Sequence, residues 1–431
     1  MAAPKTKGTE LPTVDLPVLR TQPELVTVQD GYLGAELFDD RFIQDPYPLY
    51  ARMLAQAPVH RIGGSDFHAV CSWDAVHEVV ARPEDFSSNL TATMTYQPDG
   101  TIGLFPMDGL GGPTQVLAIA DDPAHAVHRR KLVPHLAVKR IRALESFVVE
   151  NTGQLWREEL RHGRIEWMSA MANRLPMMVI CRLIGVPDAD AEQLAAWAYA
   201  STQLLEGLVS EKQLAAAGVA AGELIGYVAE RLQLAMANPP DNLLGDLAAA
   251  CTAGELDSTT AQFMMVTLFG AGGESTASLI GSATDIVATQ PEIQDRLRES
   301  PQLIPAFLEE VLRFESPFRG HYRHVRDDCT LAGHELAAGS RLILLWGAAN
   351  RDPAHFEAPN QFRLDRTGTN GHISFGRGAH FCVGAALARL EARVVLDDLL
   401  QHTTRIEKPE RGRWLPSLLV RRLESLTLAF E

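Results

Sequence analysis

The chain has 431 residues, 46% of them apolar and 22% charged, which predicts a large globular core and excludes a disordered or fibrous protein. Its 39 Lys and Arg residues against 54 Asp and Glu residues give a net charge of −15, which disfavours nucleic-acid and anionic-membrane partners. No apolar run reaches the roughly 18 residues of a membrane span. The five scattered cysteines predict neither a disulfide framework nor a structural zinc site.

Residues 1–33 combine four prolines with Thr, Lys and Glu and lack the apolar core of a secretory signal. We therefore expect a loosely ordered leader and a cytoplasmic protein. From residue 45 to 82, strands alternate with helices, for example a strand at 68–71 and a helix at 73–81. Residues 87–113 then lose periodicity, and their apolar content favours a long loop that forms one wall of a pocket.

A long helical region is predicted from about residue 123 to 310, with turn signals at Gly163, Gly185, 238–240 and Gly254. Strands are predicted at 331–336 and 341–346, followed by a coil at 349–370, a last helix at 384–402 and a hairpin-like tail at 415–430. No repeat or linker divides this part of the chain. We therefore predict a mainly α fold with a small β-rich part, in one large domain at residues 34–431.

The segment 374–384 places one cysteine, Cys382, among glycines and directly before the last predicted helix. Backbone N–H groups and the dipole at a helix start favour a thiolate over a thiol. Glycines at 376, 378 and 384 allow a large flat ligand to approach the backbone closely. A thiolate beside open space is suited to binding iron, although a bare Cys-x-Gly would more often be a turn with a buried, inert cysteine.

This run resembles the haem-ligand loop of the cytochrome P450 superfamily, Phe-x-x-Gly-x-x-x-Cys-x-Gly, at Phe375, Gly378, Cys382 and Gly384. The resemblance implies a single P450-type fold and a haem b cofactor whose iron takes the Cys382 thiolate as its ligand. It also implies haem contacts for Phe375, Gly376, His380 and Gly384. The wider pattern resembles soluble mycobacterial or actinobacterial members.

A second motif is Glu310-x-x-Arg313, which is followed by Pro, Asn, Phe and Arg residues in the order found in the family. On that resemblance, Glu310 and Arg313 form a buried charge network that braces the core on the haem side. The family often has an arginine just before the position of Phe362, where this chain has Gln361. Either Arg363 or Arg366 is then expected to complete the network.

A third motif lies in the predicted helix at 267–276, which contains three glycines. Each glycine weakens a helix by about 1 kcal/mol relative to alanine, so room for a ligand or a tight helix crossing is expected there. The motif resembles the oxygen-side helix of the family, Ala-Gly-x-Asp/Glu-Thr, which implies haem contacts for Ala271 and Gly272. It also implies catalytic roles in proton delivery for Glu274, Ser275 and Thr276. Because serine replaces the usual threonine and lacks its rotamer-restraining methyl group, we expect weaker coupling of oxygen use to product formation.

The expected propionate partners make a fourth motif, which rests on the same resemblance. His125 and Arg129 lie one helical turn apart, and Arg323 matches an arginine of a strand. Together with His380, these side chains are expected to bind the two haem propionates through charge-assisted hydrogen bonds.

The resemblance implies a monooxygenase that inserts one atom of O2 into a hydrophobic organic substrate. Because nothing in the chain resembles a flavin or nicotinamide domain, a separate ferredoxin and its reductase are the expected electron donors. A basic cluster at 129–131, extended by basic residues at 139–142, is the expected ferredoxin surface.

The expected substrate pocket is mostly apolar, which favours a hydrophobic ligand. Arg319 and His321 are expected nearby, where they would hold a polar end of the substrate. The expected apolar lining is residues 90–110, Leu204, Leu205, Leu208, Val209, Met265, Phe269, Phe318 and 415–419.

Two alternatives remain open. A peroxide-driven enzyme of the same haem class would make the Ser275 replacement harmless, although the retained Glu274 argues against it. A non-catalytic haem sensor or carrier would bind a ligand without forming a product.

Overall fold

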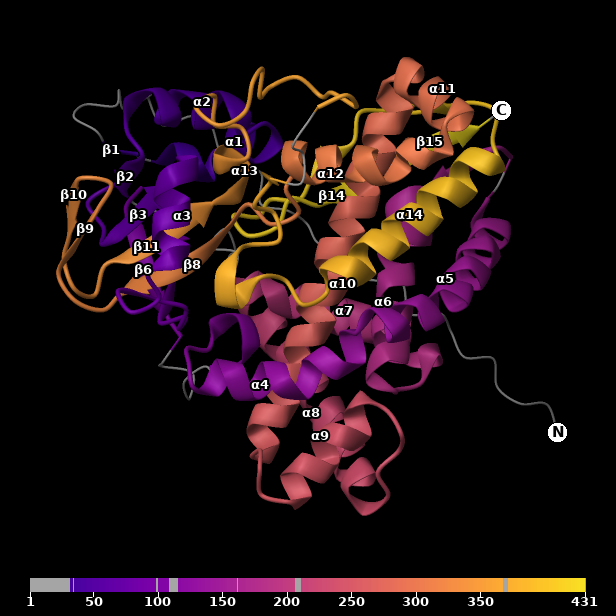
Figure 1. Ribbon diagram of the computed structural model, residues 1–431, viewed down its shortest axis with the longest axis horizontal. Helices are drawn as coiled ribbons and strands as arrows, with labels where there is room; N and C mark the ends of the chain where they lie inside the picture. Colours follow the sequence, from indigo (N-terminus) through magenta and orange to yellow (C-terminus); the bar gives the residue numbers. More distant parts are fainter. Residues whose placement is uncertain are drawn as a thin grey trace.

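The computed structural model describes residues 32–33, 35–97, 100–107, 115–160, 162–205, 211–366 and 371–430. The expected leader lies outside these ranges apart from strand β1 (Tyr32–Leu33). The described chain is mainly helical with small sheets, as predicted. The strands of the largest sheet lie at one side of the molecule, while two strands near the C-terminus lie among the helices on the other side (Figure 1).

Helices occupy most of the middle of the chain, as the sequence predicted, and the last helix begins one residue later and ends one residue earlier than expected. Their bounds are α1 (Asp40–Gln44), α2 (Tyr47–Gln56), α3 (Trp73–Ala81), α4 (Ala124–Leu132), α5 (Val138–Glu159), α6 (Arg174–Ile184), α7 (Ala191–Thr202), α8 (Glu211–Ala237), α9 (Leu243–Thr252), α10 (Ser258–Thr289), α11 (Pro291–Glu299), α12 (Ile304–Phe314), α13 (Trp346–Ala349) and α14 (Ala385–Gln401).

A six-stranded mixed sheet, with the order β1-β2-β3-β11-β8-β4, forms the β-rich side of the molecule. Besides β1, its strands are β2 (Val59–Ile62), β3 (Phe67–Val70), β4 (Phe86–Ser87), β8 (Gly320–Val325) and β11 (Arg341–Leu345). Smaller pairings join β5 (Ala92–Tyr96) to β6 (Ile102–Pro106), β9 (Cys329–Leu331) to β10 (His334–Leu336), and β13 (Arg413–Trp414) to β14 (Leu423–Ser425). A three-stranded sheet has the order β12 (Ile406–Glu407), β15 (Thr427–Phe430) and β7 (Arg164–Glu166).

Three local expectations were wrong. The expected loop at 87–113 contains the antiparallel hairpin β5–β6, in which Met94 faces Leu104; residues 98–99 and 108–113 lie outside the described ranges. The single strand expected at 331–336 is split between β9 and β10, because Ala332 and Gly333 take positive φ angles of 48° and 82° and turn the chain. The tail is not one hairpin over its whole length: the consecutive strands β13 and β14 do pair antiparallel, but β15 pairs with β12 and β7 instead.

Helix α10 runs through the interior, where it packs against α6, α7, α8 and α14. Its first turn is capped by Asp257, whose carboxylate accepts the backbone N–H of Thr260 at 2.8 Å. By length and composition alone α10 could cross a membrane, but 61% of its most apolar window is buried inside the protein. An apolar surface on all sides is what a core helix requires.

The α10 glycines allow a close helix crossing as well as room for a ligand. A Cβ atom on Gly272 would lie 2.6 Å from Cδ1 of Ile180, and one on Gly273 would lie 2.9 Å from Cε of Met177. Both neighbours belong to α6. The two explanations considered for this motif therefore hold together, because Gly272 also lines the cavity described below.

The charge network on α12 is fully buried, with both Glu310 and Arg313 at 0% exposure. Arg313 donates through Nε and Nη2 to the two Glu310 oxygens, each at 2.8 Å. Arg366 completes the network through Nε, at 3.1 Å from Glu310 Oε1. Arg363 contributes only its backbone N–H, since its side chain turns outward to Asp365. The choice that the sequence left open therefore falls on Arg366.

Candidate functional site

A cavity lies between α10 and the loop that leads into α14, and we call it the Cys382 cavity. Parts of α4, α6 and β8 close its sides. Twelve of the thirteen predicted site residues line it: His125, Arg129, Ala271, Gly272, Ser275, Thr276, Arg323, Phe375, Gly376, His380, Cys382 and Gly384. The thirteenth, Glu274, is not among the lining residues.

The loop that carries Cys382 is held in shape by its own backbone. The Cys382 N–H donates to the Phe375 carbonyl at 2.8 Å. Gly376 and Gly378 have φ angles of 66° and 68°, which L-residues with side chains rarely adopt. Gly384 is the N-cap of α14. The thiol is therefore presented to the cavity at a helix start, as the glycine spacing predicted.

The electrostatics of the Cys382 thiol differ from the sequence-based expectation. Burial raises its pKa, and this effect outweighs the backbone N–H groups of Gly384 and Ala385 and the charges of Arg129 and Arg389, which lower it. The helix start therefore assists the thiolate without being sufficient for it. A cation next to Sγ would supply the missing stabilisation.

On the opposite side of the cavity, α10 presents two adjacent hydroxyl residues. Ser275 donates its hydroxyl to the Ala271 carbonyl at 2.5 Å, one helical turn earlier. Thr276 also lines the cavity and is buried. Both hydroxyl groups therefore lie on the same cavity as Cys382.

Glu274 points elsewhere and is only 2% exposed. Its Oε1 accepts from Arg422 Nη2 at 3.2 Å, and its Oε2 accepts from the Thr202 hydroxyl at 2.9 Å. Arg422 also donates to the side chain of Asn173 at 3.1 Å. No local pattern identifies Arg422 as the partner of Glu274, because the two residues are 148 positions apart.

The wall formed by α4, β8 and the Cys382 loop is cationic. Arg323 is 8% exposed, and within the described ranges it forms no ion pair. Its side chain donates a hydrogen bond to the Tyr322 carbonyl at 2.7 Å, and burial lowers its pKa to about 10. Arg129 donates to the Phe381 carbonyl at 2.9 Å.

Two histidines lie beside these arginines, and their rings stack with centroids 4.0 Å apart. Burial, Arg323 and His125 lower the pKa of His380 to about 3, and its buried Nδ1 has no partner among the described residues. Buried cations and an unpartnered imidazole nitrogen suit a ligand with carboxylate groups. The propionates of a haem meet that requirement, so the residues present fit this cofactor.

Two further residues on the cavity were not assigned a role from the sequence. Trp346 donates its indole N–H to His321 Nδ1 at 2.6 Å. This bond fixes the neutral imidazole with its proton on Nε2, in agreement with a pKa lowered to about 3 by burial, Arg323 and His380. Glu391 is buried, its Oε2 has no hydrogen-bond partner within the described part of the chain, and burial raises its pKa well above the usual value. A buried carboxyl group therefore borders the cavity.

Most of the expected apolar lining lies elsewhere. Phe318 is on the cavity, whereas Met265 and Phe269 are buried in the helical core. The described residues of 90–110, with Leu204, Leu205 and 415–419, do not line the cavity either, and residues 98–99, 108–110, Leu208 and Val209 lie outside the described ranges. The observed apolar lining includes Val80, Leu117, Leu132, Leu136, Ile180, Leu183, Leu268, Leu279, Leu312, Val383 and Leu387.

Helical spacing could have identified part of this lining. Leu268, Ala271, Gly272, Ser275 and Leu279 follow the i, i+3, i+4, i+7 pattern of one helix face. By this spacing Met265 falls on the same face as Leu268 and Gly272, and Phe269 lies just beyond its edge, yet both are buried in the helical core, so spacing alone does not exclude Met265.

Of the two polar residues expected to hold a substrate, only one lies on the cavity. His321 borders the cavity, while Arg319 is not among its lining residues and donates to the Ile43 carbonyl at 2.6 Å.

Comparisons with known proteins all point to one protein family. The sequence model described as Cytochrome P450 matches residues 231–417. The chain is 62% identical over 421 residues to Cytochrome P450 144 of Mycobacterium tuberculosis (strain ATCC 25618 / H37Rv), which covers 97% of this chain and 96% of that protein. It is 32% identical to Cytochrome P450 107B1 of Saccharopolyspora erythraea, covering 90% of this chain and 96% of the relative.

A solved structure of CYP109E1 from Bacillus megaterium in complex with testosterone is similar in fold, with a TM-score of 0.80 and 28% identity. The similarity covers 91% of this chain and 99% of that one. The likeness thus extends well beyond the loop around Cys382. The chain therefore belongs to the cytochrome P450 family, whose members are monooxygenases that bind haem through a cysteine thiolate.

Proposed function

We propose that this protein uses O2 to insert one oxygen atom into a hydrophobic organic substrate, with electrons from a ferredoxin and its reductase. The observation that carries the proposal is the Cys382 cavity, in which a thiol, a cationic wall and two α10 hydroxyl groups share one largely apolar space. Residues 34–431 would form the catalytic domain.

The cofactor would be held from two sides. Cys382 would ligate the haem iron, and Gly376 and Gly384 would leave room beside it. His125, Arg129, Arg323 and His380 would bind the propionates, since the wall they form carries buried positive charge. When bound, haem supplies the oxidising chemistry that the side chains of this chain lack.

The remaining cavity residues would manage protons and exclude water. Thr276 and Ser275 would relay protons through their hydroxyl groups on α10. Glu274 would pass protons to that helix, and its ion pair with Arg422 and its hydrogen bond from Thr202 hold its carboxyl group away from the cavity lining. The apolar side chains on the walls would keep bulk water out.

The substrate would be a mainly apolar molecule with one polar group. The lining is dominated by aliphatic side chains, and CYP109E1, a relative with this fold, binds the mainly apolar molecule testosterone in its solved structure. The Nε2–H of His321 would donate to a carbonyl or hydroxyl oxygen of the ligand, because Trp346 occupies the other ring nitrogen.

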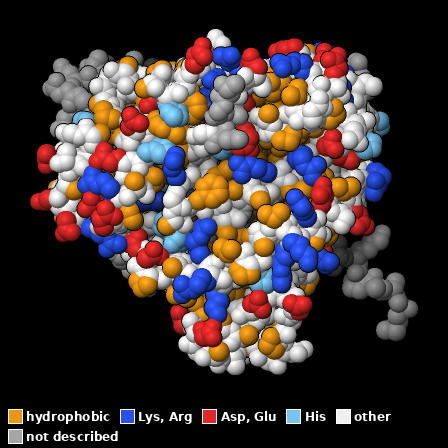
Figure 2. All heavy atoms as spheres, viewed as in Figure 1, with side chains coloured by type: hydrophobic (Ala, Val, Ile, Leu, Met, Phe, Trp, Pro, Cys, Tyr) orange, Lys and Arg blue, Asp and Glu red, His pale blue; other side chains and the backbone are white. Residues whose placement is uncertain are grey.

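The ferredoxin would dock over α4. The last turn of this helix carries Arg129, Arg130 and Lys131, and Figure 2 shows Lys and Arg side chains over this region of the surface. A basic surface suits an acidic electron donor even though the net charge is −15. The cytoplasmic location expected from the sequence is part of the same proposal.

Reconstitution with a ferredoxin, its reductase and a nicotinamide donor tests this proposal. With a hydrophobic compound that perturbs the haem spectrum, we expect an oxygenated product that carries label from 18O2 and is absent without ferredoxin. A spectral change with no product under full reconstitution would contradict the proposal and favour a sensor or carrier.

A peroxide-driven enzyme is the second candidate. It is favoured by the position of Glu274, which contacts Arg422 and Thr202 rather than the cavity, and by the serine at 275. In this case hydrogen peroxide would replace both O2 and the electron donors. Product formation with peroxide but none with ferredoxin would support this candidate over the first.

A further inference from the structure

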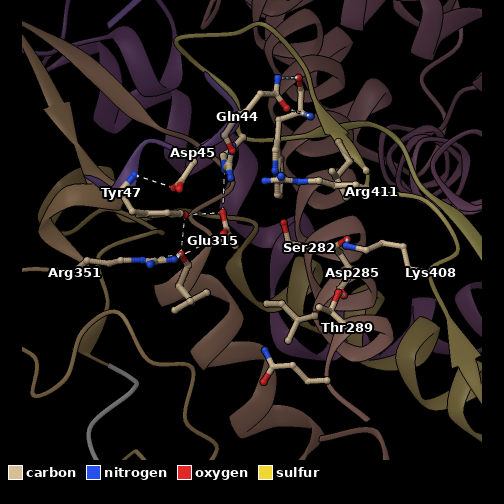
Figure 3. Close-up of a pocket in the computed structure, with 17 residues that line it drawn as sticks. Gln44, Asp45, Tyr47, Ser282, Asp285, Thr289, Glu315, Arg351, Lys408 and Arg411 are labelled. Atoms are coloured by element: carbon tan, nitrogen blue, oxygen red, sulfur yellow. Dashed lines mark hydrogen bonds and ion pairs between the residues drawn. The ribbon is translucent and has the colours of Figure 1, made fainter. Parts of the chain in front are cut away.

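A second cavity of about 330 Å³ lies apart from the Cys382 cavity, and we call it the Ser282 cavity (Figure 3). It is bordered by the start of α2, the C-terminal half of α10, the end of α12 and the residues around β13. Its volume is near the lower end of the roughly 300–1,000 Å³ of small-molecule pockets. The two cavities share no lining residue.

Most charged side chains on the Ser282 cavity already have partners. Lys408 Nζ lies 2.5 Å from Asp285 Oδ1, and Arg421 Nε lies 2.9 Å from Glu315 Oε2. Arg411 differs, because neither a hydrogen bond nor an ion pair joins it to the described part of the chain. One guanidinium group with five donors is therefore available to a ligand.

Ser282 provides an independent reason to expect a ligand. It is only 1% exposed, and its Oγ is buried without a hydrogen-bond partner in the described chain. Leaving a buried hydroxyl unsatisfied costs about 1–3 kcal/mol. In Figure 3 the side chain lies on the floor of the cavity, between the Glu315 side and the Asp285–Lys408 pair, with Arg411 extending above it.

The remaining walls provide both apolar surface and one rim acid. Ile286, Phe314 and Trp414 line the same space. Asp45 is exposed at the rim, where its Oδ1 accepts the backbone N–H of Tyr47 at 3.4 Å. Arg411 is exposed as well, and solvent screens both charges, so the attraction of Arg411 for a ligand depends on direct contact.

We propose that the Ser282 cavity binds a small organic carboxylate. Arg411 pairs with the carboxylate, the Ser282 hydroxyl donates a hydrogen bond to it, and the body of the ligand packs against Ile286, Phe314 and Trp414. A charge-assisted contact with arginine and a buried hydroxyl donor are the groups that recognise a carboxylate. An amide of the same shape lacks the negative charge and binds more weakly.

Calorimetric titration of the haem-loaded protein tests this assignment, with benzoate as the probe and benzamide as its neutral match. We expect benzoate to bind without a change in the haem absorption spectrum, and benzamide to bind about tenfold more weakly or worse. Arg411→Gln should weaken benzoate binding about tenfold, and Ser282→Ala should weaken it severalfold. Arg405→Gln is the matched control, since Arg405 lies in the same segment and pairs with Glu407 outside the cavity.

Three results would overturn the proposal. The first is no benzoate binding up to the solubility limit, and the second is unchanged binding in Arg411→Gln. The third is weaker benzoate binding in Arg411→Gln together with unchanged binding in Ser282→Ala. That result would mean that Arg411 attracts anions at the surface and that the cavity takes no part in binding. A change of the haem absorption spectrum that follows the same benzoate concentrations as the calorimetric signal would place benzoate in the Cys382 cavity. This result would also contradict the assignment.

Discussion

Arg323 is a buried cation that has no acidic ion-pair partner within the described residues, so its burial is favourable only with a ligand that carries negative charge. We expect Arg323→Gln to lower the ratio of haem to protein in the purified enzyme and to speed haem loss to an acceptor. Arg326→Gln is the control, because Arg326 is exposed and pairs with Asp121. Equal haem retention in both variants would contradict a role for Arg323 in binding propionate.

Glu274 tests the proton route. We expect Glu274→Gln to slow product formation while haem content stays near normal, because a neutral amide cannot donate or relay a proton as a carboxylic acid does. Glu274→Asp should restore part of the rate, and Glu292→Gln, at an exposed position on α11, should leave it unchanged. The rate is measured with the ferredoxin system at several pH values. If Glu274→Gln keeps the full rate and pH profile, the proton route runs elsewhere, with Thr276 the next candidate.

At the scale of single residues, the sequence identified site residues whose motif lies within a short segment. It did not identify residues that reach the site only through the tertiary fold. Cys382 could be found because its glycines and the following helix lie within ten residues of it. The contact of Glu274 with Arg422 could not be found, because Arg422 reaches α10 only through the position of the C-terminal tail. The bond from Trp346 to His321 likewise depends on the chain folding back between β8 and α13.

At the scale of elements, the Glu310 network joins α12 to the coil around Arg366. Glu310→Gln would leave two buried arginines without a counter-charge, and we expect it to lower the free energy of unfolding by about 3–5 kcal/mol. Chemical denaturation of the haem-loaded protein measures this loss. Arg363→Gln should cost less than about 0.5 kcal/mol, since only its backbone N–H contacts Glu310. Similar losses in the two variants would contradict the network as described.

Elements with a strong local pattern were predicted well, and elements defined by remote partners were not. The capped, apolar α10 and the glycine-initiated α14 have signals within their own sequences. Strand β15 does not, because its partners β12 and β7 are chosen by the tertiary fold, whereas β14 pairs with its chain neighbour β13. The β5–β6 hairpin was missed because β6 (Ile102–Pro106) does not alternate between apolar and polar residues, although β5 does.

For the whole molecule, the dependence of stability on pH offers a test. Burial alone would raise the pKa of Glu309, but hydrogen bonds from Arg389 and His372 lower it from 4.5 to about 2. A depressed carboxyl pKa contributes stability that is fully present above about pH 4.5 and is lost as the pH falls toward about 2. We expect Glu309→Gln to be less stable than the parent at neutral pH, with the difference narrowing below about pH 4.5.

Denaturant unfolding from neutral pH down to about pH 3.5 measures this difference, and Glu299→Gln at an exposed position serves as control. A gap that stays constant over this range would show that the Glu309 carboxylate contributes nothing as a charge.

The central claim is that Cys382 binds the haem iron as a thiolate in the cavity it shares with α10, and the carbon monoxide difference spectrum of the reduced protein tests it most directly. We predict a Soret band shifted well to the red, as thiolate ligation produces, and the loss of this band in Cys382→Ser. A band that stays well to the blue in the parent protein, or an unchanged spectrum in Cys382→Ser, would contradict the account.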